Sequence, residues 1–102
     1  MTQKGVEYLT RDDDAELNEY LNIMHNQHMI FENCTFSLCS NKQFRNSTFI
    51  NCIFEHVTRE TYFVNCTFEA PTFYAGFNAN LQDCNISRFS GKIGELKERI
   101  KQ

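Results

Sequence analysis

Residues 44–54, with the sequence FRNSTFINCIF, contain two overlapping units that each begin and end on Phe. Inside each unit lie a variable residue, an Asn, a small residue and then a polar residue or Ile. The same frame, with Leu, Ile or Asp as occasional substitutes, occupies residues 31–36, 44–49, 49–54, 63–68 and 81–86. Because a closing Phe can open the next unit, the repeat advances five residues at a time. An internal repeat of this kind predicts the architecture of the whole chain.

The large apolar residues also recur over a longer interval of 18 or 19 residues. They form three columns, which are Phe44–Phe63–Leu81, Phe31–Phe49–Phe68–Ile86 and Phe36–Phe54–Phe73. Neither the 3.6-residue period of an amphipathic helix nor the alternation of an ordinary strand produces such spacings. They predict a solenoid whose coils stack at about 4.8 Å, so that each column becomes a ladder of like side chains.

The other repeat positions have their own expected roles. Asn and Asp tolerate turn geometry and bond their own backbone, so we expect corners at Asn33, Asn46, Asn51, Asn65 and Asp83. Small residues stand two positions before the apolar columns, at Cys34, Ser47, Cys52, Cys66 and Cys84. Their cysteines are expected to pack as compact hydrophobes. The column neighbours Cys34/Cys52 and Cys66/Cys84 lie within disulfide distance, although parallel side chains disfavour that bond. Cys39 falls outside this pattern.

The Cys-Thr-Phe and Ser-Thr-Phe units at 34–36, 47–49 and 66–68 resemble the pentapeptide-repeat family over residues 29–91. That resemblance implies a right-handed quadrilateral β-helix. One side of each coil departs from the repeat, at residues 37–43, 55–62 and 74–80, and Met29 and Pro71 replace small residues. We therefore expect a divergent, mainly β member with three to four coils, three regular sides and one irregular side.

Both ends of the ladder are expected to carry caps within a single domain of 102 residues. Residues 1–28 are predicted to form a strand and a helix over 11–25, since Leu17, Tyr20, Leu21 and Met24 share one helical face. Residues 92–102 are predicted to form a short helix with Ile93, Leu96 and Ile100 on one face. This helix either caps the β-helix or joins two copies as a homodimer.

Charge and composition exclude several classes of protein. A net charge of −3 disfavours binding to nucleic acid through phosphate contacts. The sequence has no run of about 20 apolar residues and no signal-peptide pattern, so we expect no membrane span and a cytoplasmic location, in the host if a phage encodes the chain. Residues 1–25 carry a net charge of −4 and residues 92–102 a net charge of +2.

Catalytic and metal-binding motifs are missing from the sequence. It contains no nucleophile elbow, no phosphate-binding loop and no zinc-ligand spacing, and no carboxylate completes a site with His25 and His28. We therefore expect no enzymatic activity, no metal and no cofactor. A small enzyme with His56, Arg59, Glu60 and Tyr62 in one cleft is the alternative.

The expected function is a non-enzymatic protein-interaction module, a small bacterial or phage accessory protein that inhibits or modulates a target by direct contact. The candidate partner-binding residues are Asp12, Asp13, Asp14, Glu16 and Glu19 at the acidic helix, and Arg59, Glu60, Tyr62 and Tyr74 on the irregular side. The family resemblance also implies an alternative, a DNA mimic that inhibits or protects an enzyme such as gyrase. The near balance of acidic and basic residues along the ladder disfavours it. The identity of the partner stays open.

Overall fold

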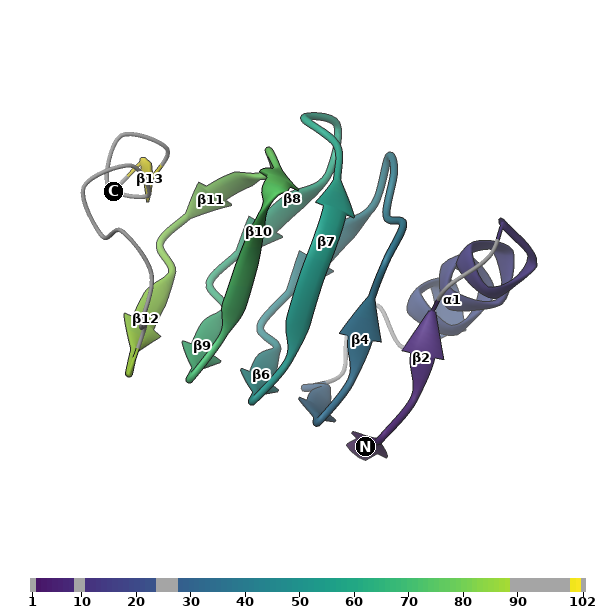
Figure 1. The fold of residues 1–102 in the computed structure, drawn as a ribbon, viewed down its shortest axis with the longest axis horizontal. Helices are drawn as coiled ribbons and strands as arrows, with labels where there is room; N and C mark the ends of the chain where they lie inside the picture. Colours follow the sequence, from purple (N-terminus) through teal and green to yellow (C-terminus); the bar gives the residue numbers. More distant parts are fainter. Residues whose placement is uncertain (1, 9–10, 24–27, 89–99, 102) are drawn as a thin grey trace.

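The computed structural model describes residues 2–8, 11–23, 28–88 and 100–101, and their strands form three parallel sheets. Sheet A contains β1 (Thr2–Lys4), β3 (Ile30–Glu32), β6 (Thr48–Ile50), β9 (Thr67–Glu69) and β12 (Asn85–Ser87). Sheet B contains β2 (Glu7–Tyr8), β4 (Thr35–Phe36), β7 (Ile53–Val57) and β10 (Thr72–Phe77). Sheet C contains β5 (Gln43–Arg45), β8 (Tyr62–Val64), β11 (Asn80–Gln82) and β13 (Ile100–Lys101). The chain visits A, B and C in turn, which makes a β-solenoid of about three turns (Figure 1).

The register of the sheets confirms the three columns predicted from the sequence. In sheet A, Phe31 pairs with Phe49, Phe49 with Phe68 and Phe68 with Ile86. Sheet B aligns Phe36, Phe54 and Phe73, and sheet C aligns Phe44, Phe63 and Leu81. The columns reach further than the repeat, because Gln3 and Tyr8 extend those of sheets A and B toward the N-terminus.

Stacked aromatic rings fill the axis of the solenoid. Within a column, the ring centroids of Phe44 and Phe63 lie 4.8 Å apart, and those of Phe49 and Phe68 lie 5.1 Å apart. Between columns the rings meet edge to face, as Phe49 and Phe54 do at 5.5 Å. Both geometries are favoured by the ring quadrupole, and the rings of all five residues are fully buried. The rings therefore stack at the coil spacing that the backbone hydrogen bonds impose.

The corners confirm the prediction for Asn and Asp. Asn33, Asn46, Asn51, Asn65 and Asp83 all have φ between 52° and 56°, the left-handed region that these residues tolerate. The four Asn side chains also bond in pairs between coils, which the sequence did not predict. Asn51 donates to Asn33 at 2.6 Å, and Asn65 donates to Asn46 at 2.8 Å. Ala70 has the same left-handed backbone, with φ 51°, without an amide side chain.

The small residues satisfy backbone carbonyls as well as fill space. Cys52 Sγ lies 3.3 Å from the carbonyl oxygen of Phe31, and Cys84 Sγ lies 3.2 Å from that of Phe63. Ser47 Oγ donates to the carbonyl oxygen of Arg45 at 2.9 Å. A buried carbonyl without a partner is costly, so a thiol or hydroxyl suits this position better than alanine. All five cysteines are buried and reduced, Cys39 among them.

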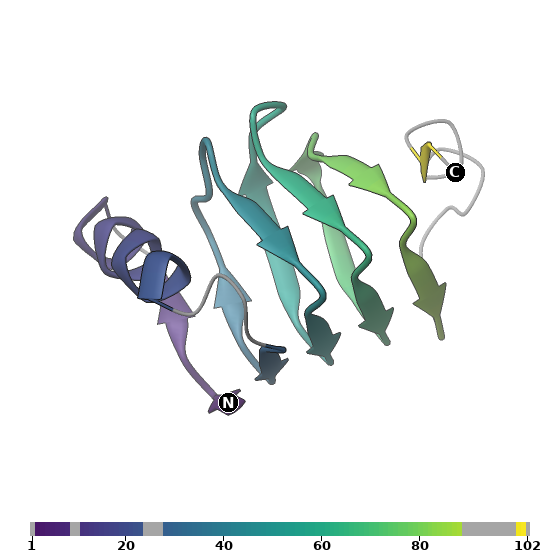
Figure 2. The ribbon, with the colours of Figure 1, turned by 180° about the vertical axis from the view of Figure 1, so that it is seen from behind.

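Helix α1 (Arg11–Ile23) confirms the predicted N-terminal helix, and it connects β2 to β3 at one end of the stack (Figures 1 and 2). Leu17 is fully buried, and Tyr20 and Leu21 pack against the same core. Among the described residues sheet C has no strand in the first coil, so the helix stands in the chain where that strand would come. The helix thus covers core that a further coil would otherwise bury.

The irregular side of each coil begins as a continuation of sheet B. Cys39 forms a parallel bridge with Val57, and Val57 pairs with Phe77 in β10. All three are fully buried, so they form a fourth inward column, which the repeat pattern does not predict. Phe77 lies 4.3 Å from Phe73 between ring centroids, which extends the aromatic core to this side.

The predicted C-terminal helix is wrong where the structure describes it. Ile100 and Lys101 form β13, which pairs with Leu81 and Gln82 of β11 in sheet C. The open edge of β11 offers backbone hydrogen bonds that a strand satisfies and a helix does not. Ile93 and Leu96 of the expected dimer face lie outside the described residues, as does the remainder of that helix.

Replacing Ala70 with Asn is expected to stabilise the protein by about 1 kcal/mol, because alanine is strained at φ 51° and Asn is not. The new amide also extends the Asn33–Asn51 ladder by one coil. Urea unfolding followed by circular dichroism measures the change. Ala75→Asn, on strand β10, is the control and gains nothing. Equal stability of the wild type and the Ala70→Asn protein would contradict this assignment.

Candidate interaction surface

The outer surface of sheet B carries a row of side chains opposite the buried Phe column. Strand alternation directs the residues on either side of each inward Phe toward solvent. We call this surface the sheet B face, and it comprises Thr35, Ser37, Ile53, Glu55, Thr72 and Tyr74.

A β-bulge interrupts the sheet B face at Tyr74. Phe73 pairs with Phe54 and Gly76 with His56, so Tyr74 and Ala75 together oppose the single residue Glu55. Gly76 permits this close approach, since a Cβ there would lie 2.6 Å from the Glu55 carbonyl oxygen and 2.7 Å from His56 Nδ1. Bulges redirect side chains and are frequent beside functional sites.

Tyr74 projects from the bulge with 51% of its surface exposed. Among the described residues it is the only large hydrophobic side chain that is exposed. Glu55 lies beside it on the neighbouring strand and accepts a hydrogen bond from the Ser37 hydroxyl. That bond holds the carboxylate in place, so the face presents an aromatic ring next to a fixed negative charge.

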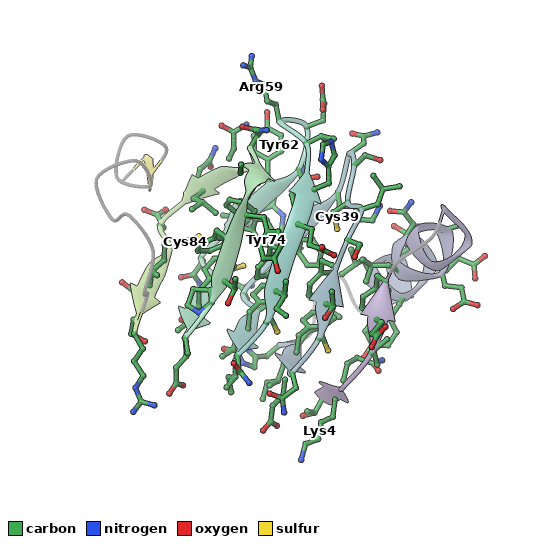
Figure 3. All side chains as sticks on the ribbon, in the orientation of Figure 1. Lys4, Cys39, Arg59, Tyr62, Tyr74 and Cys84 are labelled. Carbon is green, nitrogen blue, oxygen red and sulfur yellow. The ribbon has the colours of Figure 1, made fainter. Side chains whose placement is uncertain are left out.

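The other predicted residues of the irregular side lie apart from Tyr74. Arg59 and Glu60 are exposed in the turn closed by the hydrogen bond from Thr61 N to Thr58 O, and Asn80 donates to the Arg59 carbonyl oxygen at 2.9 Å. In Figure 3 Arg59 projects from the edge of the solenoid, away from Tyr74. Tyr62 is half-buried at the start of β8 in sheet C.

The histidine of the predicted enzymatic cleft lies on a different element from the rest of that set. His56 is exposed on β7 beside Gly76, whereas Arg59 and Glu60 lie in the turn after it and Tyr62 begins β8. His28, also exposed, lies 3.3 Å from the Thr48 hydroxyl through its Nε2. His25 lies outside the described residues.

The acidic helix is a separate feature at the N-terminal end. Glu16 and Glu19 are exposed on α1. Asp12, Asp13 and Asp14 begin the same helix, where the helix dipole favours negative charge, but their side chains lie outside the described part. The sequence thus identified two candidate surfaces that the structure keeps apart.

Sheet A presents paired rather than uniform charge. Lys4 Nζ lies 3.7 Å from Glu32 Oε2, and Arg88 Nη1 lies 3.2 Å from Glu69 Oε1, so each pair forms a salt bridge. Exposed pairs such as these contribute little to stability. They do reduce the negative potential of this side of the solenoid.

Two residues central to this surface were not identified from the sequence. Glu55 and Ser37 lie on different coils, and nothing in the repeat predicts that their side chains meet. Gly76 offered the one available signal, because an isolated glycine within a strand pattern often marks a bulge. That signal would have singled out Tyr74 over the other residues of the irregular side.

Titratable groups beneath the surface depart from their ordinary behaviour. Burial raises the pKa of Tyr8, so its hydroxyl stays neutral. The neighbouring Cys52 thiol lowers the pKa of Cys34 to about 7, whereas the Cys34 side chain and burial raise the pKa of Cys52. Cys84 and Cys66 repeat this arrangement, with the pKa of Cys84 lowered to about 7 and that of Cys66 raised.

Comparison of the chain with protein-family models, curated proteins and solved structures gives no significant match. Within the described ranges, no helix has the length and hydropathy needed to cross a membrane.

Gly76→Ala is expected to lower the free energy of unfolding by about 1–3 kcal/mol, because the added methyl group meets backbone at 2.6 Å. Thermal or urea unfolding measures the loss. Ala75→Ser, one position earlier and exposed, should change stability by less than about 0.5 kcal/mol. If Gly76→Ala and Ala75→Ser are equally stable, the close approach at the bulge is not present.

Proposed function

We propose that the chain is a divergent pentapeptide-repeat protein with a right-handed, four-sided coil. Its support is the agreement of three features: five-residue steps between large residues, parallel ladders of Phe, and Asn in left-handed corners. The inward column of Cys39, Val57 and Phe77 supplies the fourth side. Coils of 18 or 19 residues make it a variant of that architecture.

We further propose that the protein is a non-enzymatic interaction module that inhibits or modulates a cytoplasmic target protein by direct contact. The observation that carries this proposal is Tyr74, raised on a bulge beside the fixed carboxylate of Glu55. Tyrosine is enriched among the residues that dominate binding energy, because it buries a large area with few torsions to freeze.

The stacked core beneath the sheet B face favours the same role. Phe54 and Phe73 lie on the inner side of the strands that carry Glu55 and Tyr74, with ring centroids 5.5 Å apart. A surface held in this way loses little conformational entropy on binding, so more of the contact energy appears as affinity. The proposed partner is a protein with an apolar pocket for Tyr74 and a basic group within reach of Glu55.

The charges of the described surface disfavour DNA mimicry. A mimic needs a continuous row of negative charge, whereas Lys4 and Arg88 pair with two of the carboxylates of sheet A. Inhibition of gyrase that is relieved by added DNA would support mimicry in place of the Tyr74 surface.

The test uses the intact protein as bait in lysate from its host. Three baits are compared by quantitative mass spectrometry: the wild type, Tyr74→Ala and Gln82→Ala. Gln82 is an exposed residue of sheet C and serves as the matched control. We expect the captured amount of at least one protein to be about tenfold or more lower on the Tyr74→Ala bait than on the wild type, because a central aromatic contact is lost. The same protein should be captured in full by the Gln82→Ala bait.

A purified candidate is then titrated with the same three proteins by calorimetry. A protein that binds the wild type and both variants with equal affinity would contradict the assignment of Tyr74. Glu55→Lys provides a second test, since it reverses the charge expected to meet a basic group and should also weaken binding.

A further inference from the structure

Four of the cysteines form two stacked pairs that the proposed interaction surface does not use. Cys34 and Cys52 lie in successive coils at the corner before sheet B, and Cys66 and Cys84 at the corner before sheet A. Backbone hydrogen bonds join the coils at each pair, from Ile53 N to Cys34 O at 2.9 Å and from Asn85 N to Cys66 O at 3.0 Å. The two thiols of a pair are therefore in register.

The thiols of each pair have the same orientation in successive coils. Cys34 Sγ points to the carbonyl oxygen of Gln3, and Cys52 Sγ points to that of Phe31, the residue paired with Gln3 in sheet A.

Cys66 and Cys84 behave in the same way in the second pair. Their sulfurs point to the carbonyl oxygens of Phe44 and Phe63, which pair with each other in sheet C. Because the orientations are equal, the two sulfurs of each pair are expected to lie one coil spacing, about 4.8 Å, apart.

The stacked rings measure that spacing. Ring centroids of Phe31 and Phe49 lie 5.0 Å apart, those of Phe44 and Phe63 lie 4.8 Å apart, and those of Phe49 and Phe68 lie 5.1 Å apart. A disulfide requires its sulfurs to approach to about 2.05 Å with Cβ atoms about 3.8 Å apart, which strains two parallel side chains. A cation bonded to both sulfurs at about 2.3 Å spans about 4.6 Å, close to the coil spacing.

The ligand set of each site narrows the choice of cation. Within the described ranges no three His, Cys, Asp or Glu side chains come together, so a pair offers two sulfur ligands. Structural zinc requires four ligands, whereas soft thiolates select Cu(I), which accepts two ligands in a line. The thiolate is the form that binds metal, so binding requires each thiol to give up its proton.

We propose that each stacked thiol pair, Cys34/Cys52 and Cys66/Cys84, binds one Cu(I) ion between its two sulfurs. Two S–H bonds break, two S–Cu bonds form and two protons pass to solvent. No electron is transferred, and each site becomes more negative by one charge. The bound ion then links two successive coils across the corner.

Titration of the reduced full-length protein with Cu(I), without oxygen and against a chromogenic copper chelator, tests the proposal. The wild type should bind two ions per chain. Cys52→Ser and Cys84→Ser should each bind one, and the double variant none. Serine suits these corners because Ser47 makes the equivalent hydrogen bond to the carbonyl oxygen of Arg45. Cys39→Ser is the control and should still bind two, since Cys39 stacks on Val57 and not on another thiol.

Three results would overturn the proposal. One is an unchanged stoichiometry in Cys52→Ser or Cys84→Ser, and a second is the loss of an ion in Cys39→Ser. The third is a wild-type protein whose paired thiols disappear as disulfides without binding copper. Circular dichroism of each variant before titration confirms that the solenoid is folded, so that a loss of binding reports on the ligands.

Discussion

Stacking of phenylalanine rings at a separation of about one coil is the interaction on which the rest of the structure depends. The rings of Phe36 and Phe54 lie 5.0 Å apart and nearly parallel, and those of Phe44 and Phe63 lie 4.8 Å apart. Most strands have only two or three residues and could not hold their register alone. A slip of one residue would turn a buried ring toward solvent, so the ring ladder selects a single register for all three sheets.

The corners follow from that spacing. With the coils about 5 Å apart, the chain must turn sharply after each short strand, and Asn33 and Asn51 adopt the left-handed backbone that the turn requires. Their amides then fall within hydrogen-bonding distance of each other. The thiols two positions before the rings come into register in the same way, so that Cys34 stacks on Cys52 and both lie beside carbonyl groups of sheet A strands. The proposed copper sites are thus a consequence of the spacing and not an addition to it.

Much of this could be predicted from the sequence, because the inward rings and the corner amides recur at fixed intervals. The columns of Phe31, Phe36 and Phe44 and the left-handed Asn residues were predicted correctly, as was the helix that covers the first coil. The features that could not be predicted involve residues that do not follow the five-residue repeat. Gln3 enters the sheet A column as a polar residue, and Phe77 reaches the core through a bulge that breaks the five-residue step. β13 pairs with β11, and that choice depends on an open sheet edge and not on local sequence. The contact between Ser37 and Glu55, which shapes the candidate surface, joins two coils whose outward residues follow no rule.

Outward residues are free to vary because the inward ones carry the fold, and the proposed protein contact therefore uses the surface around Tyr74. The claim beneath all of these conclusions is that the rings of successive coils face one another inside the solenoid. Solution NMR of the protein labelled with ¹³C at its phenylalanines tests it most directly. We predict nuclear Overhauser contacts from the ring of Phe49 to those of Phe31 and Phe68, whose centroids lie 5.0 and 5.1 Å away. Ring signals at solvent-exposed chemical shifts without contacts between these residues would contradict the account.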